Sequence, residues 1–108
     1  MNKRNHYVLG YAVGPALEWK VQQLYAHGAR CVYFDTLIMP QSRIRNRPSM
    51  VRLLKSVRPG DVILISDVAA IGDRPSRRET FVSFLKERGV DVFIGRGWLG
   101  EITEMVAA

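Results

Sequence analysis

Four short apolar runs alternate along the chain with longer segments in which apolar residues recur at every third or fourth position. The runs cover residues 6–13, 31–34, 62–65 and 90–94, and their length and apolar content predict strands. The segments between them predict helices over residues 16–27, from about 48 to 57 and from 76 to about 88. Regular strand–helix alternation is typical of a parallel sheet with helices on both faces. We therefore predict a single α/β domain over residues 1–108, with three layers and a mainly parallel four-stranded sheet.

The second predicted helix has one apolar face. Its apolar residues fall at positions i, i+3, i+4 and i+7, and they are Met50, Leu53, Leu54 and Val57. This spacing directs them to the core and leaves Arg52 and Lys55 on the solvent side. The third apolar run has no polar position, as expected of a central parallel strand.

Glycine, proline and small polar residues mark the ends of the predicted helices. Pro15 suits the first turn of the first helix, and Gly28 suits the position just after its end. The sequence from Ser76 to Glu79 has the form of a capping box, which predicts the start of the third helix there. Residues 101–108 are long enough for about two helical turns.

Positive charge is concentrated in one part of the sequence. The net charge is +6, and residues 36–60 contain six basic and no acidic residues. A focused basic patch is expected for a polyanion partner, although a solvated basic loop is the plainer alternative. Alternating arginines in an extended loop would point the same way and continue onto the next helix. We therefore predict a weak, largely non-specific DNA-binding surface made of Arg43, Arg45, Arg47, Arg52 and Lys55.

The composition argues against several other classes of site. The single cysteine excludes an internal disulfide, and two histidines are too few for a closed Cys/His metal site, so no metal or cofactor is expected. Cys31 opens an apolar run and is expected to be a buried, inert thiol. The apolar run near the N-terminus is too short for a signal peptide or a membrane span, which predicts a cytoplasmic protein.

The end of the third strand carries the main candidates for catalysis. Ser66 and Asp67 follow the strand where α/β proteins place their ligands. A serine nucleophile needs a base within hydrogen-bond reach, but neighbours on a strand face opposite ways. Capping of a turn is the better interpretation of Asp67. Trp19 and Trp98 could stack on bases, but packing against the sheet or a partner is the simpler role.

Several segments together resemble a known family. They are GYA in the first strand, FDT after the second, NRPSMVRLL, RPGDVILI followed by an I-G turn, ERGVDVFI, and a GE-x-x-x-M ending. In order and spacing they resemble the catalytic domain of serine recombinases of the resolvase/invertase family, over residues 6 to about 108. The resemblance implies a resolvase-like fold. It also implies phosphoryl transfer on DNA by a serine, supported by arginines and an aspartate.

The residues that carry this chemistry in the family are mostly replaced. Its arginine after the first strand falls on Val13 and its serine on or near Pro15. Its D-R-L-G-R segment falls on 69–73, where Ala69, Ala70 and Asp73 replace the aspartate and both arginines. Among these positions only the arginine of the D-R-P segment is kept, as Arg47. The resemblance therefore predicts a degenerate site without catalytic residues, because phosphoryl transfer depends on positive charge around the phosphate.

The expected function is that of a non-catalytic binding or regulatory protein, of mobile-element or phage origin, which acts on DNA or on a DNA-processing or transcription partner. A divergent recombinase or nuclease with an unrecognised nucleophile is one alternative, and a small-ligand sensor at the strand-end crevice is another. The sequence stops where the family's long dimerisation helix and helix-turn-helix domain would follow, so we expect neither. A homodimer could instead form through residues 98–108, where an apolar patch is expected from Trp98, Leu99, Ile102 and Met105.

Overall fold

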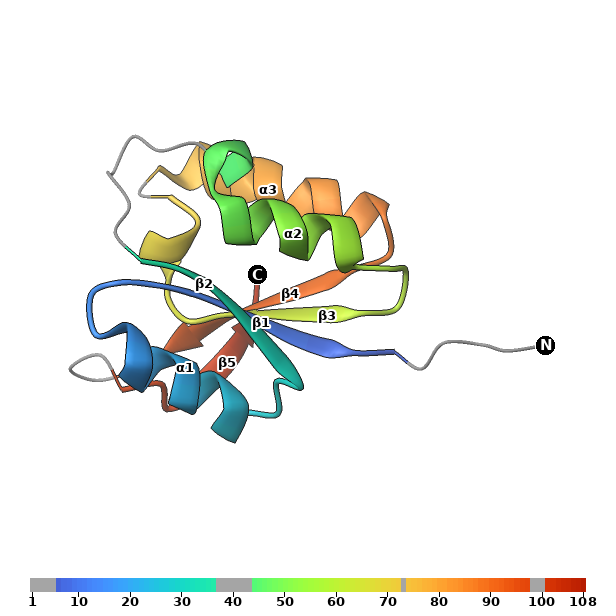
Figure 1. The fold of residues 1–108 in the computed structure, drawn as a ribbon. Coiled ribbons are helices and arrows are strands. Elements are labelled where there is room, and N and C mark those ends of the chain that lie inside the picture. The colour runs from blue at the N-terminus through green and yellow to red at the C-terminus, as the bar shows by residue number, and fades with distance from the viewer. Residues whose placement is uncertain (1–5, 37–43, 73, 98–100) are drawn as a thin grey trace.

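A five-stranded mixed sheet forms the centre of the molecule (Figure 1). The structure is a computed structural model, and it describes residues 6–36, 44–72, 74–97 and 101–108. The strands are β1 (Val8–Val13), β2 (Cys31–Asp35), β3 (Val62–Ile65), β4 (Asp91–Arg96) and β5 (Glu104–Ala107), in the spatial order β2-β1-β3-β4-β5. β3 lies between β1 and β4 and is parallel to both, which confirms the central strand expected from its uninterrupted apolar run.

Helices cover both faces of the sheet, as predicted. Helix α1 (Leu17–Ala26) lies on one face, and α2 (Pro48–Ser56) and α3 (Pro75–Glu87) lie side by side on the other (Figure 1). Two short 3₁₀ helices, η1 (Ile44–Asn46) and η2 (Val68–Ala70), precede α2 and follow β3. The buried cluster on the α2/α3 face contains 13 residues, whereas the one on the α1 face contains five, counted over the described residues. The prediction of one three-layer α/β domain is confirmed.

The prediction of four strands and a helical ending is wrong. Residues Glu104–Ala107 form β5, which pairs antiparallel with β4 and makes the sheet mixed. The antiparallel pairing begins next to β5, at Thr103, whose amide donates to the Arg96 carbonyl at 2.8 Å. A segment of this length is too short to be a stable helix by itself, whereas the open edge of β4 offers it a row of backbone partners.

Two other local predictions are corrected. Helix α3 begins at Pro75, with Arg74 as its N-cap and no side-chain capping bond, so the expected capping box at Ser76 does not form. Proline needs no amide partner in the first helical turn, and this places the N-cap at Arg74, two residues before Ser76. Cys31 is exposed rather than buried, because it begins β2 at the edge of the sheet. Gly28 and Gly89 do follow the ends of α1 and α3, both with positive φ.

Candidate functional site

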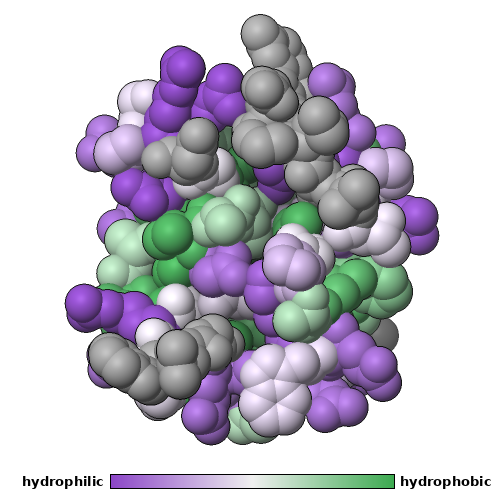
Figure 2. Space-filling view, turned by 90° about the vertical axis from the view of Figure 1, so that its left-hand side faces the viewer, coloured by the Kyte–Doolittle hydropathy of each residue, from purple (hydrophilic) through white to green (hydrophobic). Residues whose placement is uncertain are grey.

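The carboxyl ends of β1, β2 and β3 meet at one end of the molecule. Parallel pairing brings Val13 beside Asp35, and the ends of β1 and β3 are also neighbours. The structure thus places Val13, Pro15, Ala69 and Ala70 at the same end of the sheet, while Asp73 lies outside the described residues. Figure 2 looks onto this end and shows hydrophilic residues near its centre with hydrophobic ones to either side.

Asp35 is the polar centre of this end on the α2 side. Its Oδ2 accepts a hydrogen bond from the Tyr11 hydroxyl at 2.7 Å. Its two oxygens also accept from the first backbone amides of α2, with Oδ1 3.1 Å from Ser49 N and Oδ2 3.3 Å from Met50 N. A carboxylate is favoured at a helix N-terminus, because the amides there have no partner within the helix and carry partial positive charge. Asp35 therefore fixes the start of α2 to the end of β2.

Tyr11 and Arg47 complete this cluster. Burial raises the pKa of the Tyr11 phenol, and the hydrogen bond to Asp35 and the negative charge of Asp35 raise this pKa further. The nearby Arg47 guanidinium opposes this shift, and its Nη1 donates to the Ala70 carbonyl. Tyr11 is completely buried and Arg47 is 5% exposed, so both groups are fixed by the fold.

A second polar cluster lies on the α1 side. The Lys20 ammonium is 2.9 Å from Asp67 Oδ2 and donates to the Val13 carbonyl at 3.0 Å. Asp67 Oδ1 accepts from the Ala70 amide at 3.2 Å, which confirms the predicted turn cap. Ser66 is buried, and its hydroxyl has no hydrogen-bond partner among the described residues. Asp67 thus has both oxygens engaged elsewhere, and no Ser66–Asp67 pair is formed.

Sequence reasoning missed Tyr11 and Lys20 as members of these clusters. The signal for Tyr11 was a phenol near the middle of a mostly apolar predicted strand, which packing alone would also explain. Lys20 was the only lysine or arginine in the first predicted helix, but its partners Val13 and Asp67 become neighbours only after the sheet forms. Neither residue had a local pattern that identified its partner.

The predicted DNA-binding residues are not all on one surface. Arg52 and Lys55 are exposed on α2, as expected, but Arg47 is buried. The expected extended loop is also wrong where it can be examined, since Ile44–Asn46 form a 3₁₀ helix, in which alternate residues do not share a side. Arg43 and the side chain of Arg45 lie outside the described part of the structure.

Helix α3 adds cationic residues that the sequence analysis did not assign to this surface. Exposed side chains on α3 and at its two ends include Arg74, Arg77, Lys86 and Arg88. With Arg52 and Lys55 they give the α2/α3 layer six exposed cations, against two exposed acids, Glu79 and Glu87, within the described segments. The sequence did not reveal this group, because its α3 members are spread over fifteen positions. They join Arg52 and Lys55 only when α2 and α3 lie side by side.

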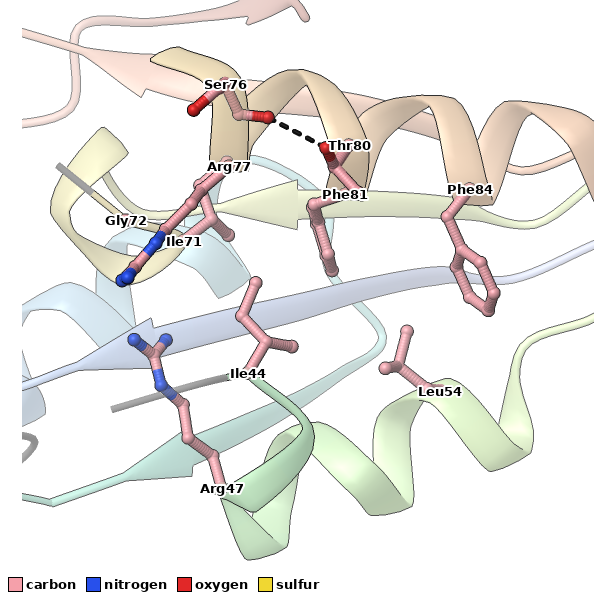
Figure 3. Close-up of a pocket in the computed structure, with 10 residues that line it drawn as sticks. All are labelled: Ile44, Arg47, Leu54, Ile71, Gly72, Ser76, Arg77, Thr80, Phe81 and Phe84. Atoms are coloured by element: carbon pink, nitrogen blue, oxygen red, sulfur yellow. Dashed lines mark hydrogen bonds between the residues drawn. The ribbon is translucent and has the colours of Figure 1, made fainter. Parts of the chain in front are cut away.

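A groove of about 620 Å³ runs between α2 and α3. Its walls are largely apolar, with Leu54 from α2 facing Phe81 and Phe84 from α3 (Figure 3). At one end, the guanidinium groups of Arg47 and Arg77 point toward each other (Figure 3). The groove therefore combines an apolar length with a cationic end.

Other kinds of site find less support in the described residues. No three histidine, cysteine or acidic side chains among residues 6–36, 44–72, 74–97 and 101–108 gather closely enough to share a metal ion. No helix in the same ranges combines the length and apolar character needed to cross a membrane.

Ile102 is buried and Met105 packs in the same cluster as Leu24, so these two do not contribute to the apolar patch expected near the C-terminus. Trp98 and Leu99 of that patch lie outside the description.

No protein-family model matches this chain, and no curated protein matches it at a significant level. The relation to serine recombinases therefore stays a prediction that rests on the sequence segments quoted above.

Proposed function

We propose that this protein is a non-catalytic, resolvase-like binding module whose contact surface is the α2/α3 layer and whose partner is nucleic acid. One observation carries the proposal: α2 and α3 lie together on one face of the sheet (Figure 1), and these helices with the two ends of α3 carry six exposed cationic residues. Helix α1, on the other face, has one acidic and one basic residue, Glu18 and Lys20, and Lys20 is paired with Asp67. A surface with an excess of positive charge attracts polyanions and accelerates their encounter with the protein.

The resemblance to serine recombinases supports DNA as the polyanion and also supports the absence of catalysis. Alanine occupies the positions matched to the family's aspartate and arginine at 69 and 70, and Ala70 uses its backbone groups to hold Arg47 and Asp67. Arg47, the one matched arginine that is kept, is buried against that carbonyl. In this role the protein would occupy DNA, or assist a DNA-processing or transcription protein, without cutting the strand.

The test is the salt dependence of duplex DNA binding. Each phosphate contact contributes about 0.9 to the slope of log affinity against log salt. The double variant Arg52→Ala/Lys55→Ala should bind more weakly and reduce this slope by about two. A matched control, Arg30→Ala/Arg96→Ala, removes the same charge from exposed residues outside the α2/α3 layer and should leave the slope nearly unchanged.

Equal losses in both double variants would show that net charge alone attracts DNA, and no binding by the parent protein at low salt would reject nucleic acid as the partner.

The absence of catalysis is tested by a separate experiment. Incubation with supercoiled DNA and a divalent metal should give neither nicked DNA nor a covalent adduct. A reproducible adduct on any serine would contradict a non-catalytic role.

A further inference from the structure

The groove between α2 and α3 is not accounted for by phosphate binding alone. Its volume of about 620 Å³ lies within the range of about 300–1,000 Å³ in which proteins hold small organic ligands. Such sites are mostly apolar with a few polar groups that orient the ligand, which is also the composition of this groove. A mononucleotide belongs to this size class and combines a flat apolar surface with one anionic group.

The aromatic wall of the groove is accessible. Phe84 is 41% exposed, although it is a large apolar side chain, and it lies in the last turn of α3. The Arg88 guanidinium lies 4.2 Å from the centroid of its ring, a cation–π contact that restrains the ring. Exposed rings beside cationic groups are the usual stacking platforms for bases of single-stranded nucleic acid.

The cationic end of the groove fits a phosphate. Arg77 comes from the first turn of α3 and Arg47 from the residue before α2, and both guanidinium groups turn inward (Figure 3). Arg47 is only 5% exposed, but it lines the groove, and the Ala70 carbonyl holds it in this direction. Two guanidinium groups that face each other repel, and an anion between them converts this repulsion into two charge-assisted contacts. The planar guanidinium group also matches phosphate oxygens in pairs.

We propose that this groove binds one nucleotide of a single strand, with the base against Phe84 and the phosphate between Arg47 and Arg77. This inference rests on the proposed nucleic-acid function and specifies the form of nucleic acid that is preferred. A base within a duplex is paired and stacked and cannot enter a groove between two helices. Single-stranded DNA or RNA should therefore bind more tightly than a duplex of the same length.

Fluorescence anisotropy with a labelled oligothymidylate, a matched uridylate strand and a duplex tests the proposal. Phe84→Leu, which keeps an apolar side chain without a ring, should weaken single-strand binding by about 5- to 100-fold, the usual effect of losing one stacked base. Phe84→Tyr should restore it, and neither variant should change duplex binding. Trp19→Leu is the matched control, because it removes an exposed aromatic side chain from the opposite face. The DNA and RNA strands show which sugar the groove accepts.

An abasic strand of the same length separates stacking from charge. It should bind the parent protein about as weakly as the thymidylate strand binds Phe84→Leu. Equal affinity of the parent for the thymidylate and abasic strands, or an unchanged affinity of Phe84→Leu for the thymidylate strand, would overturn the nucleotide site and favour an acidic protein segment as its occupant. In that case salt-dependent duplex binding through Arg52 and Lys55 would still stand. Loss of all binding by the parent protein would instead reject both proposals.

Discussion

The two helical layers of this molecule are attached to the same sheet by different means. On the α2/α3 side, a cluster of 13 buried residues is joined by a partly buried carboxylate, Asp35, which accepts hydrogen bonds from both Tyr11 and the start of α2. On the α1 side, the cluster has five buried residues, and the Lys20–Asp67 pair that joins helix to strand end is partly exposed. This comparison indicates that the α2/α3 layer, which carries the exposed cations, is attached to the sheet more firmly than α1 is.

This difference matters for a binding surface. Side chains that contact a polyanion gain most when their backbone is already in place, because ordering on binding subtracts from affinity. Helix α2, which carries Arg52 and Lys55, is fixed at its first turn by Asp35 and along its length by the buried Met50 and Leu53. The α1 face carries two exposed aromatic residues, Trp19 and Tyr25, but little net charge.

Core truncations on the two sides give the largest effects. Leu53 and Leu24 are both completely buried, and replacing either by alanine should cost about 2–5 kcal/mol of the free energy of unfolding. Leu53→Ala should lie at the upper end, because partly buried side chains, which can move into the space, are a larger share of the cluster around Leu24, with seven beside five buried residues, than of the cluster around Leu53, with seven beside 13. Urea unfolding measures both, with Trp19→Ala as a surface control that changes stability by less than about 0.5 kcal/mol. The reverse order would show that the α1 side is the more rigid one.

The hydrogen bond of Tyr11 gives the next largest effect. Tyr11→Phe leaves Asp35 without its hydroxyl partner and should lower the free energy of unfolding by about 1.5–3 kcal/mol at neutral pH. The folded state raises the pKa of this phenol, so its contribution is complete below the unfolded value of about 10 and decreases as the pH rises above it. The stabilities of parent and variant should therefore converge in alkali.

Urea unfolding of the parent and Tyr11→Phe, at neutral and at alkaline pH, gives the difference in their free energies of unfolding at each pH. Absorbance titration of the folded protein should show one phenol with a raised pKa, and this phenol should be missing in Tyr11→Phe. Tyr25→Phe, at a position that is 49% exposed, is the control and should leave the delayed phenol in place. A gap between parent and Tyr11→Phe that stays constant up to high pH would argue against a raised pKa.

The strand arrangement was largely predictable from sequence, but the contacts at the strand ends were not. Four strands and three helices follow from local apolar periodicity, which does not depend on distant residues. The fifth strand was missed because Glu104–Ala107 has no strong pattern of its own and becomes a strand through pairing with β4. Strand pairing is a non-local property that a single sequence does not display.

The candidate site shows the same limit. Arg47 was assigned to the surface because charge and spacing describe a residue's type and not its burial, and its partner Ala70 lies 23 positions away. Tyr11 and Asp35 meet only because parallel register sets Val13 opposite Asp35. By contrast, Arg52 and Lys55 were correctly placed in solvent, since helical periodicity within α2 determines their side.

The ion pair on the α1 side should have the smallest effect. A double-mutant cycle with Lys20→Met and Asp67→Asn should give a coupling energy of about 0.2–1 kcal/mol, because Asp67 is 37% exposed and water screens the pair. Added salt should reduce this coupling further. A coupling energy above about 2 kcal/mol that is insensitive to salt would mean that α1 is held as firmly as α2, and the contrast between the two layers would be lost.

The exposed thiol of Cys31 is a suitable site for attaching a fluorescent label. It is the only cysteine in the chain, so a maleimide dye would label a single position without mutagenesis. Cys31 is paired with Leu9 at the amino end of the parallel strands, away from Asp35 at the other end of β2. A fluorophore there would report tumbling and proximity of a labelled oligonucleotide while leaving the cationic helices and the groove chemically untouched.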